Sequence, residues 1–175
     1  MSSVSRLDFR DVVVALLLNA LQEARAGHCG VIDLEITQDA VCVTDDGRGL
    51  PVQPHPQSGR LLLEVIFTGA RRSAKNTLAL VNANCLWLEV EVHREGTLWF
   101  QRYELARPVS SPPEQRGQAT RRGTAIRCAP VFGEAPTFED LRALVQELSR
   151  EEAGIRVKVR IRDRRVAKDE TIVIA

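Results

Sequence analysis

One stretch of the chain places an acidic side chain beside a turn that contains two glycines. Asp45 follows an apolar run over 41–44, and Gly47, Gly49 and Pro51 come directly after it. Glycine lets a backbone turn sharply and pass close to something flat. A carboxylate fixed at the end of a strand can accept a hydrogen bond from an exocyclic amine, as adenine presents. We interpret Asp45 as a candidate ligand for such a ring; the alternative is a turn aspartate that only caps its own loop.

A second set of polar side chains lies on the helix predicted over residues 8–26. Most of this helix is apolar all round, so we expect it to be buried. Asn19, Gln22 and Glu23 are polar exceptions whose spacing places them on one face. Ala15 lies one turn earlier on that face. A polar row on a buried helix is expected to line a cavity or to pair internally.

The composition is that of a globular protein of one domain, residues 1–175, with 44% apolar and 27% charged residues. The net charge of +1 gives no argument for nucleic acid, and direct DNA binding is not favoured. Four cysteines without a CxxC pair predict reduced core thiols in a cytoplasmic protein. Three scattered histidines predict no metal constellation. No apolar run reaches the roughly 18 residues of a membrane span, so we expect no membrane partner.

Hydrophobic periodicity places helices and strands along the whole chain. Basic residues alternate with apolar ones over 155–162, which predicts a charged solvent face, with phosphate-backbone binding as the alternative. Helices and antiparallel strands in this order predict an α+β two-layer sandwich. The predicted helices are 8–26, 60–67, 78–84 and one that starts at Thr137 and ends near Gly154. The predicted strands are 31–37, 40–44, 86–93, 97–103, 123–128, 155–162 and 171–175, with loops at 52–59 and 110–122.

Several segments together carry a resemblance to a known family. They are Asn19 with 23–29, then 43–52 followed by His55-Pro56, then 81–83 with 87–90, and Gly123-Thr124. In this combination the chain resembles the ATPase domain of the DNA gyrase B subunit, over residues 11–165. That domain is a GHKL ATPase with the Bergerat fold, like those of heat-shock-90 chaperones, histidine kinases and mismatch-repair ATPases. The resemblance implies a mostly antiparallel mixed sheet with helices on one face.

The resemblance also implies roles for individual residues. Asp45, with Thr124 close by, matches the aspartate that binds the adenine amino group. Glu23 and Arg48 match a pair that bridges the pocket edge, with Arg48 over the ligand; a purely structural salt bridge is the alternative. Asn19 matches the asparagine that coordinates magnesium beside the phosphates, and an asparagine satisfied by backbone groups is the alternative. Gly47, Gly49 and Pro51 would shape the pocket wall.

The chain departs from this family where hydrolysis is performed. The resemblance places a water-activating glutamate at position 15, where this chain has alanine, and the amide of Gln22 cannot act as a base. The glycine-rich phosphate lid corresponds to residues 69–77, which contain one glycine. Arg71, Arg72 and Lys75 in this segment would meet phosphate as point charges or form a solvated loop. We also expect neither an N-terminal dimerisation arm nor a transducer domain.

These observations predict a degenerate gyrase-B-like domain with no catalytic residue. It would be a pseudo-ATPase that binds a small flat ligand, either an adenine nucleotide (ATP or ADP, with Mg²⁺) or an aminocoumarin-type inhibitor. A protein-interaction or regulatory module that binds no nucleotide is an equal outcome of the same losses. The alternatives are a working Mg²⁺-dependent ATPase whose base comes from elsewhere or from a partner chain, and a regulator that pairs with a gyrase subunit.

Overall fold

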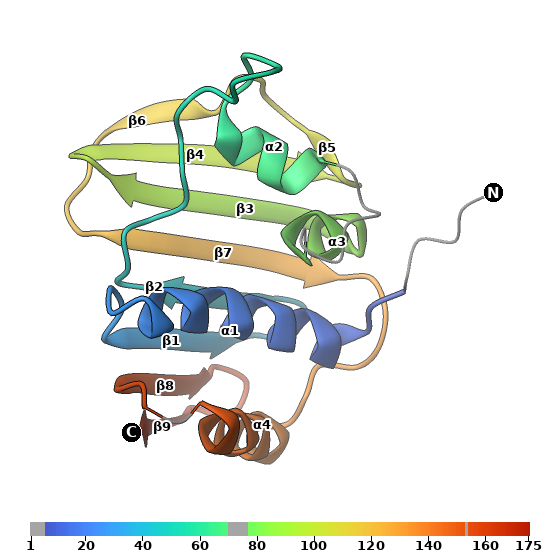
Figure 1. The fold of residues 1–175 in the computed structure, drawn as a ribbon. Helices are drawn as coiled ribbons and strands as arrows, with labels where there is room; N and C mark the ends of the chain where they lie inside the picture. Colours follow the sequence, from blue (N-terminus) through green and yellow to red (C-terminus); the bar gives the residue numbers. More distant parts are fainter. Residues whose placement is uncertain (1–5, 70–76, 153) are drawn as a thin grey trace.

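The computed structural model describes residues 6–69, 77–152 and 154–175. Within these ranges the chain forms four helices and nine strands (Figure 1). The helices are α1 (Phe9–Arg25), α2 (Leu62–Thr68), α3 (Thr77–Ala83) and α4 (Phe138–Glu151). The strands are β1 (Val31–Ile36), β2 (Val41–Asp45), β3 (Cys85–Arg94), β4 (Thr97–Glu104), β5 (Arg107–Pro108), β6 (Glu114–Gln118), β7 (Gly123–Pro130), β8 (Val157–Asp163) and β9 (Lys168–Ile174).

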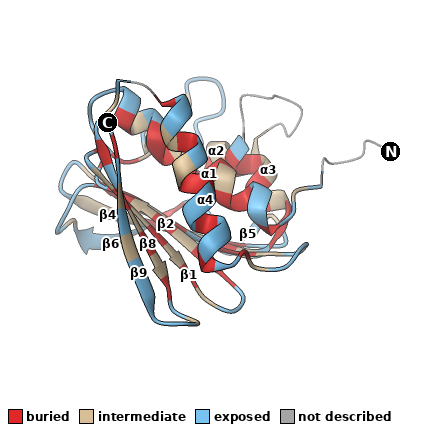
Figure 2. Cartoon of the chain, turned by 90° about the horizontal axis from the view of Figure 1, so that it is seen from below, coloured by how far each residue is buried: buried red, intermediate tan, exposed pale blue. Residues whose placement is uncertain are grey.

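All nine strands belong to one mixed sheet in the order β5-β4-β3-β7-β2-β1-β8-β9, with β6 paired to β4. Neighbouring strands run antiparallel except β1 and β8, which are parallel. The helices pack on one face of the sheet and leave the other face open (Figures 1 and 2). This arrangement confirms the predicted α+β two-layer sandwich.

The central helix α1 is buried because its apolar residues surround it, as predicted. Asp8 caps its N-terminus in a capping box with Asp11, and Gly27, at φ 76°, follows its C-terminal cap. Val12, Leu16 and Leu21 are at most 1% exposed. Burial of such a side chain contributes roughly 1.5–3 kcal/mol. The core between helices and sheet therefore holds α1 across the middle of the sheet.

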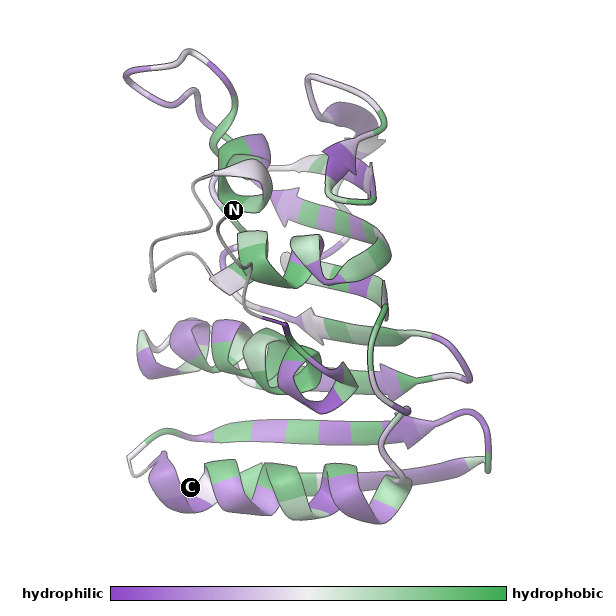
Figure 3. Ribbon diagram, turned by 90° about the vertical axis from the view of Figure 1, so that its right-hand side faces the viewer, coloured by the Kyte–Doolittle hydropathy of each residue, from purple (hydrophilic) through white to green (hydrophobic). Residues whose placement is uncertain are grey.

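The helix α4 covers the β8 end of the sheet. Thr137 and Asp140 form the predicted capping box. The apolar stripe of this helix is buried, and Figure 3 shows apolar and hydrophilic residues in bands along it. None of the described helices is both long and apolar enough to cross a lipid bilayer.

The structure differs from the sequence prediction mainly at the β4 edge of the sheet. We predicted a loop over 110–122, and the structure places β6 there. Every residue of β6 is exposed, so its pairing depends on main-chain hydrogen bonds rather than on apolar alternation. The strand β9 also starts at Lys168, earlier than the predicted 171.

The basic residues of β8 lie on the open face, where carboxylates of β1 meet them. Arg162 and Arg160 lie 3.1 and 3.7 Å from Asp33 Oδ1, and Arg164, just after β8, lies 2.9 Å from Glu35 Oε2. These pairs agree with the prediction of a charged solvent face.

Candidate functional site

The carboxylate of Asp45 lies at the end of β2, where its two oxygens have different surroundings. Oδ1 accepts hydrogen bonds from the backbone N–H groups of Gly47, at 2.9 Å, and of Thr124, at 3.4 Å. No donor within the described ranges binds Oδ2. The residue is 5% exposed, and this burial raises the pKa of Asp45 to about 6. One oxygen of a buried carboxylate thus keeps its capacity to accept a hydrogen bond.

Three glycines allow the backbone to pack around this carboxylate. A Cβ on Gly47 would lie 2.8 Å from Asp45 Oδ1 and 3.0 Å from the Glu23 side chain. At Gly123, with φ 108°, a Cβ would lie 1.9 Å from the Asp45 carbonyl oxygen. Gly49 has φ 81° and approaches Val92. The sequence suggested that Gly47 and Gly49 make room for a flat partner; the close neighbours in the structure are atoms of the chain itself.

Glu23 and Arg48 form the ion pair that the sequence predicted. Arg48 Nη2 lies 2.9 Å from Glu23 Oε1, and Arg48 Nε lies 3.1 Å from Oε2. The backbone N–H of Arg48 also donates to Oε2 at 3.0 Å. The hydrogen bond from the Arg48 side chain outweighs partial burial and lowers the pKa of Glu23. The pair ties the C-terminal part of α1 to the turn after β2.

Asn19 and Ala15 lie further along the same helix. Ala15 is 7% exposed and belongs to the hydrophobic core. Asn19 is half-buried, and its side chain has no hydrogen-bond partner among the residues that the structure describes. Gln22, the other polar residue of the predicted row, is exposed. Of the polar residues predicted on this helix face, Glu23 therefore contacts the turn that follows Asp45, whereas Gln22 is exposed to solvent.

The hydroxyl of Thr124 joins the β7 strand to the same turn. Its Oγ1 accepts a hydrogen bond from the backbone N–H of Leu50 at 3.1 Å, and Thr124 is 3% exposed. Pro51, predicted as part of the pocket wall, is half-buried and follows Leu50. Thr124 thus contacts the turn through its side chain and Asp45 through its backbone.

One residue at this site escaped the sequence prediction. Arg94, at the end of β3, donates from Nη1 to the carbonyl oxygen of Gly49 at 2.8 Å. Its place in the strand alternation puts it on the face of Val90 and Val92, which are buried. The sequence signal that could have identified Arg94 is a charged residue at the end of this row of apolar residues.

The segment that the resemblance identifies as a shortened phosphate lid falls largely at residues 70–76, which lie outside the described residues. Four bulky residues that the sequence suggested as possible plugs of the slot contribute to the core or pack against it: Leu16, Leu50, Ile66 and Leu78. Among the residues described, three or more metal-binding side chains do not gather at any one point.

Comparison of the sequence with known proteins finds relatives among DNA gyrase B subunits. The DNA gyrase B subunit of Thermotoga maritima is 35% identical over 157 residues, which cover 79% of this chain and 24% of that protein. The DNA gyrase B subunit of Treponema pallidum is 33% identical over 184 residues, covering 94% of this chain and 28% of that protein. The chain thus spans about a quarter of the length of these curated relatives. No protein-family model matches it.

Two solved structures share the fold. The topoisomerase IV ATP-binding domain of Francisella tularensis, in complex with a small-molecule inhibitor, has a TM-score of 0.84 at 23% identity. This match covers 95% of our chain and 87% of that one. The 43K ATPase domain of Thermus thermophilus gyrase B, in complex with an aminocoumarin, has a TM-score of 0.81 at 29% identity. Here 91% of our chain and 44% of that chain are covered.

Proposed function

We propose that this chain, which belongs to the gyrase B-like family of GHKL ATPase domains, binds the adenine ring of a nucleotide and does not hydrolyse the nucleotide. The observation that carries the proposal is that the two oxygens of the Asp45 carboxylate have different hydrogen-bond partners. Oδ1 is held by two backbone N–H groups, whereas Oδ2 has no donor within the described chain. The free oxygen of a largely buried carboxylate is stabilised when a ligand amine donates to it.

The neighbours of Asp45 supply the rest of the adenine side. Glu23 holds Arg48 in a forked ion pair at the edge of the turn. Thr124 fixes the turn through the backbone N–H of Leu50. Asn19 fits a role in binding magnesium, because its amide is half-buried and without a described partner. Magnesium commonly takes one or two protein ligands and completes its shell with phosphate oxygens and water.

The lack of a base supports the second half of the proposal. Position 15 carries a methyl group, which cannot accept a proton from water. The acidic residues of α1 are Asp11, whose carboxylate accepts the backbone N–H of Asp8 in the capping box, and Glu23. Both oxygens of Glu23 are bound to Arg48, which lowers the pKa of Glu23. Loss of a general base typically slows a reaction by ~10²–10⁴-fold. We therefore infer that bound ATP would persist.

Calorimetry tests the binding half. ADP, a non-hydrolysable ATP analogue and novobiocin would be titrated into the wild type and into Asp45→Asn. Asp39→Asn is the matched control, because Asp39 is exposed in the turn between β1 and β2. We expect the wild type and Asp39→Asn to bind at least one of these ligands and Asp45→Asn to lose that binding. Absence of heat from all three ligands, or unchanged binding by Asp45→Asn, would contradict the proposal.

Phosphate release tests the catalytic half. We expect the wild-type chain with ATP and Mg²⁺ to release phosphate at the rate of a protein-free blank. Steady Mg²⁺-dependent release that Asn19→Ala abolishes would instead establish a working ATPase. That result would overturn the claim of inactivity while leaving the adenine contact in place.

A further inference from the structure

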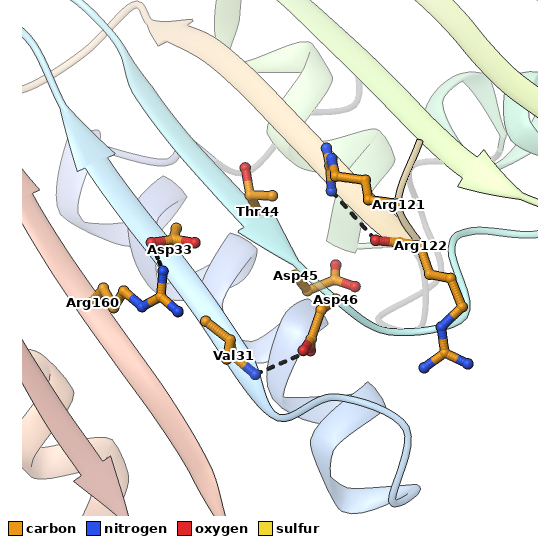
Figure 4. Close-up of a pocket in the computed structure, with 8 residues that line it drawn as sticks. All are labelled: Val31, Asp33, Thr44, Asp45, Asp46, Arg121, Arg122 and Arg160. Carbon is orange, nitrogen blue, oxygen red and sulfur yellow. Dashed lines mark hydrogen bonds and ion pairs between the residues drawn. The ribbon is translucent and has the colours of Figure 1, made fainter. Parts of the chain in front are cut away.

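The open face of the sheet carries a hollow of about 390 Å³ where β1 and β2 meet the segment before β7. Figure 4 views it with the helices behind the sheet. Thr44 lies near its centre, the pair of Asp33 and Arg160 lies on one side, and Arg121 lies on the other. These side chains belong to the face opposite to the one that α1 covers. Asp45 also lines the hollow, so the hollow adjoins the proposed adenine site at the end of β2.

The acidic groups of the hollow already have cationic or N–H partners. Asp33 Oδ1 lies near two guanidinium groups, those of Arg162 and Arg160, at 3.1 and 3.7 Å. Asp46 Oδ1 accepts hydrogen bonds from two backbone N–H groups, at 2.8 and 3.0 Å. Asp33 thus has two arginines beside it, and the lining of the hollow as a whole holds three aspartates and three arginines.

Arg121 contributes a guanidinium group that has no ion-pair partner among the described residues. No carboxylate of the described residues lies within ion-pair distance of its guanidinium, which donates only a 3.4 Å hydrogen bond to the carbonyl oxygen of Arg122. In Figure 4 its side chain extends toward Thr44, whereas that of Arg122 points away. The positive charge of Arg121 acts on the imidazole of His93, which is buried. Burial is the main cause that lowers the pKa of His93, and the charge of Arg121 is the next.

We propose that this hollow binds a small anion that carries a phosphate group, with Arg121, Arg160 and the hydroxyl of Thr44 as its ligands. Guanidinium groups match the geometry of phosphate oxygens and bind them through charge-assisted hydrogen bonds. The volume of about 390 Å³ also leaves room for a small organic group attached to the phosphate. The shared chemistry is the phosphate dianion, supplied either free or as a monoester.

NMR titration tests the site with two probes, inorganic phosphate and ribose 5-phosphate, at an ionic strength kept constant with KCl. We expect saturable shifts at Thr44 and Arg121, and an upward move in the pKa of His93, because a bound anion offsets the charge of Arg121. Tighter binding of ribose 5-phosphate than of phosphate identifies a monoester site. Equal binding identifies a site for the free anion.

Two variants and a control make the test specific. Arg121→Gln removes one charge-assisted contact and should weaken binding by roughly tenfold. Thr44→Val removes the hydroxyl with little change in shape and should also weaken it. Arg150→Gln removes an exposed charge in the last turn of α4 and should leave binding unchanged. Shifts that KCl alone reproduces, or that persist in Arg121→Gln, would overturn the proposal, as would the absence of shifts with both probes.

Discussion

Replacement of Asp45 by asparagine should stabilise the protein while removing its proposed contact with adenine. In the wild type a carboxylate is buried with two backbone N–H groups on Oδ1 and no described donor on Oδ2. Asparagine can keep the bonds to Gly47 and Thr124 through its own oxygen. Its Nδ2 then occupies the place of Oδ2, so a ligand amine would meet a donor instead of an acceptor.

The size of the effect follows from the pKa of Asp45. Burial raises this pKa from an ordinary 3.8 to about 6, which corresponds to roughly 3 kcal/mol. At a pH between these two pKa values, Asp45 is protonated in the folded state and ionised in the unfolded chain. The free energy of unfolding therefore falls as pH rises from about 4 to about 6, and the loss persists above that window. Asparagine does not titrate, so the variant should lack this loss.

Urea denaturation of the wild type and Asp45→Asn at several values between about pH 4 and about pH 7 measures the difference. We expect the variant to gain stability over the wild type as pH rises, by up to roughly 3 kcal/mol. Asp46→Asn is the control. The backbone N–H groups of Val31 and Gly30 outweigh burial and lower the pKa of Asp46, so its removal should shift stability in the opposite direction. A difference between wild type and Asp45→Asn that does not change with pH would refute the reasoning.

Two other perturbations probe the turn around Asp45. Gly123→Ala should lower the free energy of unfolding by at least roughly 3 kcal/mol, because the new Cβ would lie 1.9 Å from the Asp45 carbonyl oxygen. Gly117→Ala is its control, with φ 110° and open space around the Cβ, and should cost about 1–2 kcal/mol in the same denaturation assay. Similar losses in the two variants would show that backbone strain alone matters. Arg48→Gln should leave the unfolding midpoint almost unchanged, raise the pKa of Glu23 measured by NMR, and weaken ADP binding by about tenfold. Unchanged ADP affinity would make the ion pair purely structural.

The sequence predicted the elements whose pattern comes from packing. The helix α1, the hairpin of β3 and β4 and the capped helix α4 all lie where hydrophobic periodicity places them. The strand β6 was missed because all its residues are exposed and it adds to the sheet through the backbone of β4. Main-chain pairing at a sheet edge leaves no periodic signal in the side chains.

The candidate site shows the same limit. The family resemblance implied the pair of Glu23 and Arg48 and the proximity of Asp45 to Thr124, and both contacts are present in the structure. It could not show that Gly123 packs against the Asp45 carbonyl or that Arg94 binds the Gly49 carbonyl. Both contacts join segments that are far apart in the chain. A single sequence does not show which residues of two such segments lie opposite each other.

The two halves of the proposed site depend on different parts of the protein, and this separation explains how one could be kept without the other. The adenine side is built from backbone contacts between the turn after β2 and the start of β7, which the core holds in place. By the resemblance to gyrase B, the proposed hydrolytic side would need a carboxylate at position 15 of α1, where Ala15 packs in the core. A glutamate there would add a charge to a nearly buried position, which destabilises a fold unless the charge is paired. In the proposed pseudo-ATPase, Ala15 therefore favours the stability of α1 over catalysis, and the contacts of Asp45 with Gly47 and Thr124 do not involve Ala15.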